Sequence, residues 1–177
     1  MPITLPLPPH DHARRVVAES TGMPPASASL RVRRAAASDL DELVALELRS
    51  FSSDLLSRAQ YRRHLDSDSA LVLVASANHH LFLGSAVLFF RKRSTVARLY
   101  SLATAPETRG QGVGAALLAA VADAARRRGA RVLKLEVRTD NAAAIRLYER
   151  HGFRRSGLYA HYYEDGADAW RYEQTLG

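Results

Sequence analysis

The sequence contains no cysteine and only one tryptophan, and it has no long apolar run. Without thiols, the chain has no disulfides, no thiolate metal sites and no covalent cysteine intermediate. The longest apolar stretches, "LVLVA" (71–75) and "LFLGSAVLFF" (81–90), are far shorter than the ~20 residues that span a membrane. The seven histidines show no spacing typical of metal ligands. We therefore expect a soluble, cytoplasmic protein that binds no metal.

Prolines are scarce outside residues 1–29, which hold six of the seven. Such a segment resists regular structure, and only a short helix around 12–19 is expected in it. It has no continuous apolar stretch of the kind found in a secretory signal, so we expect none. We interpret residues 1–29 as a flexible tail or tether and residues 30–177 as one catalytic domain.

Positive charge is in excess, with a formal net charge of +7. This balance favours anionic partners, such as nucleic acid, an acidic protein or a phosphate-bearing cofactor. Basic runs at 91–93, 126–128 and 154–155 are compatible with a nucleic-acid or ribosome contact. Such runs are more typical of the solvated ends of helices and strands, so the sequence does not decide whether the protein contacts nucleic acid or a ribosome. No membrane contact is expected.

Apolar periodicity and turn residues predict a mixed sheet interrupted by helices. Ser38 is expected to cap the first helix, and Gly129 to end the long alanine-rich helix. The expected strands cover 30–34, 70–76, 81–90, 96–104, 131–137, 155–163 and 168–176. Four helices are expected. The first begins at residue 38, and the other three cover 57–65, 112–128 and 141–152.

The segment "RGQGVGAALL" (109–118) places three glycines at the start of that long helix. Backbone N–H groups at a helix N-terminus bind phosphate without side chains. A P-loop is excluded, because Gly114 is followed by alanines instead of Lys and Ser or Thr. The glycine pattern of a dinucleotide-binding fingerprint is matched from Gly110 to Ala115, and Glu136 ends the next strand. Such a fingerprint normally opens a series of alternating strands and helices, whereas here it follows hairpins. A dinucleotide site and a plain glycine-rich turn therefore both stay open at this point.

A second stretch, "LEVRTDNAAAIRLYERHGF" (135–153), resembles the signature of the GNAT N-acetyltransferase superfamily. In particular, it resembles the branch that acetylates the N-terminal alanine of ribosomal proteins and other protein N-termini. Arg109, Gly112 and Gly114 occupy the positions of the family's acetyl-coenzyme A loop. The order of elements is similar over about 96–153, and the expected hairpin and first two helices before it extend the resemblance back to about residue 30. The resemblance implies an α/β (α+β) GNAT fold, with a mixed, mostly antiparallel sheet of about six or seven strands and about four helices.

The resemblance also implies residues for acetyl transfer from acetyl-CoA to an amine. Glu136 is implied as the base that takes the amine's proton through water, and Tyr148 as the acid that protonates the leaving thiolate. A backbone N–H of Leu102 or Ala103 is implied as the donor to the charge that develops on the carbonyl. Because no cysteine is present, direct attack in a ternary complex is expected. The implied acetyl-CoA contacts come from Leu102, Ala103, Thr104, Arg109, Gly110, Gln111, Gly112, Val113, Gly114, Asn141 and Tyr148.

Several of these residues also have a purely structural explanation. Glu136 on a basic protein would form an ion pair at the rim of the sheet. Tyr148 has the helical spacing of a core side chain, and Asn141 is a typical helix N-cap. The candidate ion-pair partners of Glu136 are Arg98, Lys134 and Arg138.

The acceptor is expected to contact the loop between the first two helices and the last hairpin. The candidate substrate residues are Phe51, Tyr159, Tyr162 and Tyr163, and the tyrosines would wall a channel for an N-terminal peptide. Carboxylates at 164, 165 and 168 would instead bind a cationic amine substrate. The purely structural alternative for this segment is a strand with exposed aromatic residues, followed by an Asp-Gly turn. We expect acetylation of a protein N-terminal or lysine amine. A small-molecule amine acetyltransferase, a non-catalytic coenzyme A-binding regulatory module and an NAD-type oxidoreductase stay open.

Overall fold

The computed structural model describes residues 29–52, 54–78 and 81–177. The expected tail and its short helix around 12–19 lie outside the described residues, apart from Ser29. Within the described part of the chain, no helix is both long and apolar enough to cross a bilayer.

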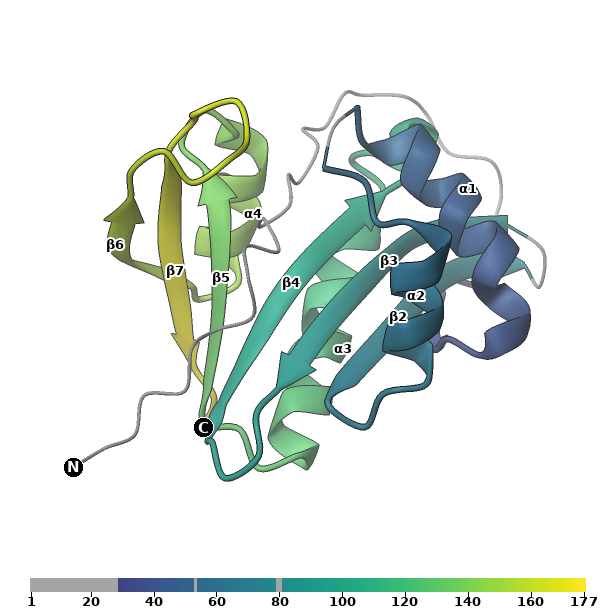
Figure 1. The fold of residues 1–177 in the computed structure, drawn as a ribbon, viewed down its shortest axis with the longest axis horizontal. Helices are drawn as coiled ribbons and strands as arrows, with labels where there is room; N and C mark the ends of the chain where they lie inside the picture. The colour runs from purple at the N-terminus through teal and green to yellow at the C-terminus, as the bar shows by residue number, and fades with distance from the viewer. Residues whose placement is uncertain (1–28, 53, 79–80) are drawn as a thin grey trace.

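Seven strands of the described chain form one sheet in the order β1-β2-β3-β4-β5-β7-β6 (Figure 1). All neighbouring strands are antiparallel except β4 and β5, which are parallel. The strands are β1 (Arg31–Arg34), β2 (Ala70–Asn78), β3 (Leu81–Phe90), β4 (Val96–Thr104), β5 (Val132–Arg138), β6 (Arg154–Tyr159) and β7 (Ala169–Thr175). The α-helices are α1 (Leu40–Ser50), α2 (Arg58–Leu65), α3 (Val113–Arg127) and α4 (Ala142–Arg150).

The expected sheet and helices are confirmed, with two local corrections. Ser38 is not the cap of α1, because it lies inside the 3-10 turn η1 (Ala37–Asp39) that precedes the helix. Asp39 holds this turn by accepting hydrogen bonds from the Ala36 N–H (2.8 Å) and the Arg33 guanidinium (2.6 Å). The sixth strand ends at Tyr159, so the expected strand 155–163 was too long at its C-terminal end.

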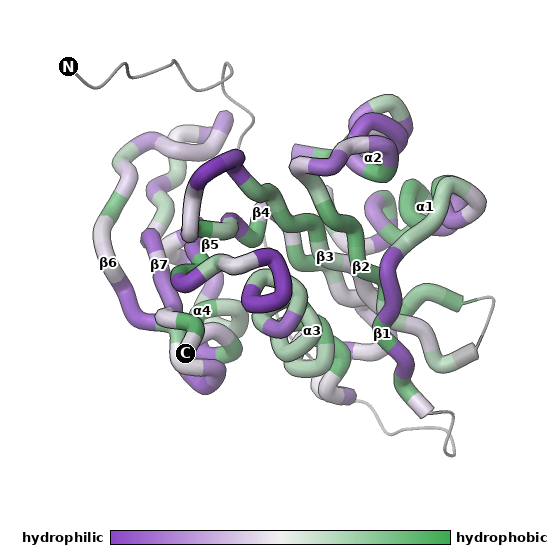
Figure 2. Tube along the Cα trace, turned by 90° about the horizontal axis from the view of Figure 1, so that it is seen from below, coloured by the Kyte–Doolittle hydropathy of each residue, from purple (hydrophilic) through white to green (hydrophobic). Residues whose placement is uncertain are grey.

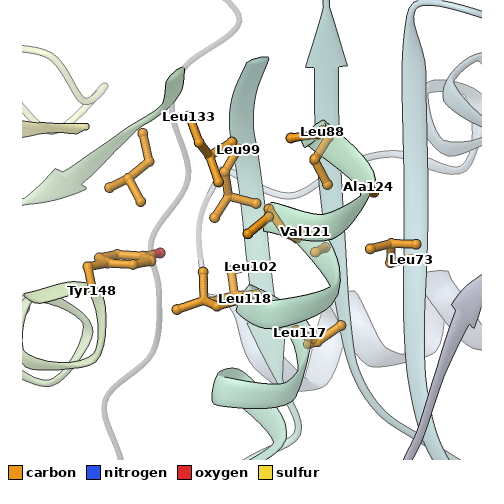
Figure 3. Close-up of a cluster of buried hydrophobic side chains, with 14 of the residues drawn as sticks. Leu73, Leu88, Leu99, Leu102, Leu117, Leu118, Val121, Ala124, Leu133 and Tyr148 are labelled. Atoms are coloured by element: carbon orange, nitrogen blue, oxygen red, sulfur yellow. The ribbon is translucent and has the colours of Figure 1, made fainter. Parts of the chain in front are cut away.

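The helices cover opposite faces of the sheet, as Figure 2 shows: α1 and α2 lie on one side, α3 and α4 on the other. The larger core packs α3 and α4 against alternate strand residues such as Leu99, Leu102 and Leu133 (Figure 3). The smaller core packs α1 and α2 against the other face, which carries Val74 and Tyr100. Alternation along β4 and β5 therefore places apolar side chains on the α3 face and Arg98 and Glu136 on the opposite one.

The parallel strands β4 and β5 pair only at one end, through 96–98 and 132–134. Beyond Arg98 and Lys134 they diverge, which is visible in Figure 1 as a widening separation between their arrowheads. The register of β4 on β3 also shifts between Leu99 and Ser101, leaving Tyr100 as the extra residue of a β-bulge. A bulge bends its strand and increases the local twist. We call the diverging ends of β4 and β5 the β4–β5 junction.

Candidate active site

Two features determine the conformation of the loop that leads into α3: its glycines adopt left-handed backbone angles, and its polar side chains hydrogen-bond to nearby backbone carbonyls. Gly110 and Gly112 have φ angles of 77° and 80°, the left-handed region that favours glycine. A Cβ at either position would meet no atom within 4 Å, so the backbone conformation and not crowding requires them. Thr108 closes the preceding turn η2 (Pro106–Thr108) by donating its hydroxyl to the Ala105 carbonyl (3.0 Å). The Gln111 amide donates to the Glu107 carbonyl (3.3 Å).

Two further glycines set how closely α3 packs. A Cβ at Gly114 would lie 3.0 Å from Leu147 of α4. A Cβ at Gly84 of β3 would lie 2.8 Å from both the Ala103 carbonyl and the Val113 side chain. The Gly114 position thus serves helix packing, while Gly84, which the sequence did not single out, brings the start of α3 close to the sheet.

The N-terminus of α3 is shaped to receive an anion. Its first hydrogen bond of the helical type runs from the Ala116 N–H to the Gly112 carbonyl (3.0 Å), so the N–H groups of Val113, Gly114 and Ala115 have no partner within the helix. The Val113 side chain is buried, whereas the backbone around Gly110 and Gly112 is exposed. Positive helix-terminus charge and clustered donors suit a phosphate.

Arg109, just before this helix, has an Nε atom that is buried and finds no hydrogen-bond acceptor among the described residues. A buried donor without an acceptor is costly, and a bound anion would satisfy it. Loop 109–114 therefore fits the diphosphate of a coenzyme A molecule.

The backbone of β4 presents donors to the β4–β5 junction. The Ala105 N–H donates to the Leu83 carbonyl of β3 (2.8 Å). Because successive N–H groups of a strand point to alternate edges, Ala103 also faces β3, whereas Leu102 and Thr104 face the β5 side. Of the two residues considered as the carbonyl donor, Leu102 has its N–H on the side of the junction and Ala103 does not.

Glu136 of β5 is held by an arginine from across the junction. Arg98 of β4 donates its Nε to a Glu136 carboxylate oxygen at 3.0 Å, and its terminal nitrogen lies 2.9 Å from the same oxygen. The same guanidinium donates to the Tyr162 hydroxyl at 2.7 Å. Burial lowers the pKa of Arg98, but the charges of Glu136 and Tyr162 outweigh it, so the pKa of this guanidinium is raised. Glu136 thus makes the ion pair that the sequence allowed, with Arg98 as its partner.

Tyr148 of α4 is almost fully buried at 2% exposed and packs edge-on against Phe153, with ring centroids 5.6 Å apart. Its ring extends from α4 toward Leu102 and Leu118, with the hydroxyl at the leading end (Figure 3). Burial, and less strongly the nearby Tyr163, raises the pKa of this hydroxyl, so Tyr148 stays protonated at neutral pH. The residue is a core side chain whose polar end points toward β4.

Asn141 caps α4, because its side-chain oxygen accepts the Ala144 N–H at 3.1 Å. Its own N–H donates to the Arg138 carbonyl at the end of β5 (3.1 Å). Asn141 therefore fixes the direction in which α4 leaves β5, and with it the position of Tyr148.

Tyr162 and Tyr163 lie in the β6–β7 turn, which folds over β5 beside Glu136. Tyr162 stacks on Tyr159 (centroids 5.3 Å apart) and lies edge-on to Tyr163 (5.4 Å). Burial and the Glu136 charge raise the pKa of Tyr162 to about 12. The Tyr163 hydroxyl is buried, and no hydrogen-bond partner for it is found in the described chain.

Two of the carboxylates suggested for a cationic substrate instead hold this turn. Asp165 makes an ion pair with Arg138 at 2.8 Å, and its side chain accepts the Ala167 N–H. Asp168 accepts the His161 N–H at 2.8 Å. Arg138 also lies over the Tyr163 ring, 4.8 Å from its centroid, and this structural role was not evident from the sequence.

Phe51 is the C-cap of α1 and is 8% exposed. It begins the α1–α2 loop, in which Asp54 adopts a left-handed φ of 53°. Ser50, the residue before Phe51, donates its hydroxyl to the Thr104 carbonyl at the end of β4 (3.4 Å), so the α1–α2 loop begins beside the β4–β5 junction. The β6–β7 turn reaches the same junction through the Tyr162 hydroxyl, which accepts a hydrogen bond from Arg98 (2.7 Å).

Residues 38–153 match the model of the acetyltransferase (GNAT) family. The chain belongs to this family. The fold agrees with solved members: the ribosomal-protein-S18-alanine N-acetyltransferase from Escherichia coli superposes with a TM-score of 0.75 at 27% identity, covering 84% of this chain and 95% of that one. The GNAT assignment removes the dinucleotide alternative for the glycine loop.

Two relatives of known or assigned activity match the sequence of this GNAT protein. A putative [ribosomal protein bS18]-alanine N-acetyltransferase of Bacillus subtilis is 31% identical over 141 residues, 78% of this chain and 90% of the relative. N-alpha-acetyltransferase 30 of Schizosaccharomyces pombe is 44% identical over 82 residues, 45% of this chain and 55% of that protein. The GNAT enzymes use acetyl-CoA, and this chain is an N-acetyltransferase that transfers an acetyl group from acetyl-CoA to an amine.

Proposed function

We propose that the acceptor is the α-amine of a protein N-terminus and that the reaction takes place at the β4–β5 junction. The observation that carries this proposal is the convergence of Glu136, Tyr162 and Tyr163 on one side of the junction, with Tyr148 directed toward β4. The relatives support the choice of acceptor, because they are named for alanine N-termini and N-alpha-amines.

Acetyl-CoA supplies an acyl group that is activated as a thioester. Loop 109–114 and the N-terminus of α3 bind the diphosphate through backbone N–H groups, and Asn141 lies beside the arm that leads to the thioester. The Leu102 N–H donates to the carbonyl oxygen as negative charge develops on it. Because these donors belong to the fixed backbone, they need no reorganisation during the reaction.

Two side chains move the protons. Glu136 accepts the proton of the acceptor ammonium through a water molecule, and the neutral nitrogen then attacks the acyl carbon. Tyr148 donates its hydroxyl proton to the departing sulfur as the carbon–sulfur bond breaks, and the second proton that the nitrogen loses as the amide forms restores the Tyr148 hydroxyl. Arg98 positions the carboxylate of Glu136 and links it to Tyr162. Direct attack accounts for the products without a covalent enzyme intermediate.

An α-amine suits this site better than a lysine amine. The α-amine has an ordinary pKa of about 8, against about 10.4 for lysine, so far more of it is neutral at physiological pH. Any carboxylate accepts a proton from the more acidic α-ammonium at a lower free-energy cost than from a lysine ammonium. Tyr159, which is 40% exposed, and the half-buried Tyr162 stacked on it supply aromatic surface for an extended peptide.

The test is a competition between two peptides of the same composition. One begins with a free alanine α-amine and has its lysine acetylated in advance; the other has a blocked N-terminus and a free lysine. Mass spectrometry should show acetyl transfer from acetyl-CoA to the first peptide and little to the second. Preferential lysine acetylation, or transfer only to small free amines, would contradict the proposed acceptor. Binding of acetyl-CoA without transfer to any amine would indicate a non-catalytic binding module.

A further inference from the structure

Three connections meet at one end of the molecule, remote from the β4–β5 junction. Arg128 at the end of α3 donates to the Asp68 carbonyl in the α2–β2 turn (2.9 Å) and lies over the Phe90 ring at the end of β3 (4.4 Å). The Arg131 N–H donates to the Thr95 carbonyl of the β3–β4 turn (2.6 Å). Figure 1 shows these turns together at the lower end of the sheet, and Figure 2 looks directly at them.

Exposed cations are concentrated in these connections. We define the basic end as residues 91–93, 126–128 and Arg131, seven Lys or Arg residues that are all exposed. The exposed carboxylates beside them are Asp68, whose carbonyl accepts from Arg128, and Asp123. Within the described chain, the one ion pair that they make joins Arg126 to Asp123. A surface hollow between α3 and the β1–β2 edge is also lined by Arg127 and Arg128, and it adds Arg34 to their neighbourhood.

Arg93 adopts a left-handed φ of 59° in the β3–β4 turn. Glycine or asparagine would take this conformation at lower cost, so the turn carries an arginine where a long basic side chain is conformationally unfavourable. The strain is small, and Asp54 and His161 share this backbone conformation in the loops beside the junction.

The basic end lies at the C-terminus of α3, whereas the glycine loop lies at its N-terminus. The helix has 15 residues, which corresponds to about 22 Å. A partner bound at the basic end would therefore leave the junction open to an acceptor.

We propose that the basic end binds the phosphate backbone of double-stranded RNA. Arginine predominates in it, and arginine matches phosphate geometry through paired N–H donors. The seven residues of the basic end carry no aromatic or branched apolar side chain of the kind that anchors protein interfaces or stacks on single strands, and the apolar lining of the adjoining hollow comes from Val32, Leu71, Leu73, Ala120 and Ala124. The exposed large apolar side chains of the described residues all lie elsewhere: Leu48, Leu55, Leu81, Leu158 and Tyr159.

The choice of RNA over DNA rests on the proposed function, because protein N-termini are made on an RNA-rich particle. The choice of a phosphate backbone rests on the surface alone. Backbone binding requires no base contacts and depends strongly on salt, since each neutralised phosphate releases counterions. Docking through this surface would hold the enzyme near RNA-associated acceptors.

The test uses the full chain and a short fluorescent RNA duplex, with affinity measured by anisotropy at several salt concentrations. The Arg91→Gln/Lys92→Gln/Arg127→Gln variant removes three cations of the basic end. The matched control, Arg146→Gln/Arg150→Gln/Arg154→Gln, removes three exposed cations from the α4–β6 side. Each lost phosphate contact should weaken binding at 0.1 M salt by roughly tenfold. It should also reduce the slope of log affinity against log salt concentration by about one. Only the first variant should show this loss, and both should acetylate a free peptide at the native rate.

Equal losses in the two variants would overturn the proposal, because they would show a response to net charge alone. It would also be overturned if DNA bound more tightly than RNA, or if polyglutamate displaced RNA at equal charge concentration, which would indicate an acidic protein partner. Failure of peptide acetylation by the native chain would contradict the proposed acceptor without affecting the binding result.

Discussion

The two neighbours of β4 are paired with it very differently. On one side, β3 pairs with β4 along seven registered positions from Gly84 to Phe90. On the other side, β5 pairs with β4 at only three, from Val96 to Arg98. The first edge is a complete ladder over a buried core, whereas the second opens into the junction where Arg98 and Glu136 meet. The missing ladder leaves backbone donors of β4 available to a ligand.

Within this one sheet, the paired β3–β4 region therefore contributes mainly to stability, and the β4–β5 junction is where we expect the chemistry to take place. We expect substitutions of side chains at the β4–β5 junction to change the rate or cofactor affinity while leaving the free energy of unfolding nearly unchanged, and substitutions of the left-handed glycines before α3 to lower both. Substitutions in the paired region should do the opposite. Each variant below is therefore measured for both properties.

Tyr148→Phe should produce the largest change. Loss of the hydroxyl removes the proposed acid, so kcat should fall about 10²- to 10⁴-fold. Steady-state kinetics with a peptide acceptor would measure this, and the KM for acetyl-CoA should stay close to the native value. Phe153→Leu is a suitable control, because it alters the packing of the same ring without removing the hydroxyl. A Tyr148→Phe enzyme with native kcat would show that Tyr148 serves only the core.

The Gly112→Asp and Gly112→Asn variants differ in charge but are similar in size, and both side chains tolerate the left-handed conformation better than most. The aspartate places a negative charge where the diphosphate is expected, so coenzyme A affinity should fall about tenfold to a hundredfold relative to the asparagine variant. Calorimetric titration would measure both affinities. Equal affinities would mean that the diphosphate binds elsewhere.

Arg98→Met should lower kcat by about tenfold, because the Glu136 carboxylate loses both its hydrogen bonds and its orientation. Lys134→Met is the control, since Lys134 pairs with Glu173 at 3.5 Å in a more exposed position on the same strand as Glu136. The control should keep its kcat. The dependence of kcat on pH should change in Arg98→Met alone, and an unchanged profile would mean that Arg98 does not position the base.

Asp39→Asn should give the smallest effect and change stability only. The Arg33 hydrogen bond lowers the pKa of Asp39, and the Ala36 N–H contributes, although burial opposes both. Because the pKa of Asp39 is lower in the folded state, its carboxylate stabilises the fold at any pH above the ordinary Asp pKa. This stabilisation is lost as the pH falls through the folded-state pKa. The variant should therefore unfold about 1 kcal/mol more easily at neutral pH. Chemical unfolding curves of the two proteins should begin to converge below about pH 4 and should coincide only once the pH lies below the folded pKa of Asp39, with kcat unchanged at pH 7.

Local signals made much of the fold predictable from the sequence. The helix 113–127 follows from its glycines and its alanine-rich apolar face, and Asn141 is an N-cap as its residue type suggests. The insertion of β7 between β5 and β6 was not predictable, because strand order depends on contacts between distant segments. Gly84 gave no signal either, since its role depends on the approach of α3 across the sheet.

The site shows the same division. The glycine loop is a local pattern, so its position at the start of α3 could be predicted. The contact of Arg98 with both Glu136 and Tyr162 joins β4, β5 and the β6–β7 turn, and three candidate cations were compatible with the sequence. Only the register of the strands selects Arg98.

The most direct test is amide hydrogen exchange, followed residue by residue by NMR, without ligand and with acetyl-CoA. We predict that the N–H groups of Leu102 and Val113 become protected when acetyl-CoA binds, because they contact the acetyl carbonyl at the junction and the diphosphate at the helix N-terminus. The Ala103 N–H, already in the β3–β4 ladder, should change little. Binding of acetyl-CoA without added protection at Leu102 and Val113 would contradict the proposal that the β4–β5 junction is the active site.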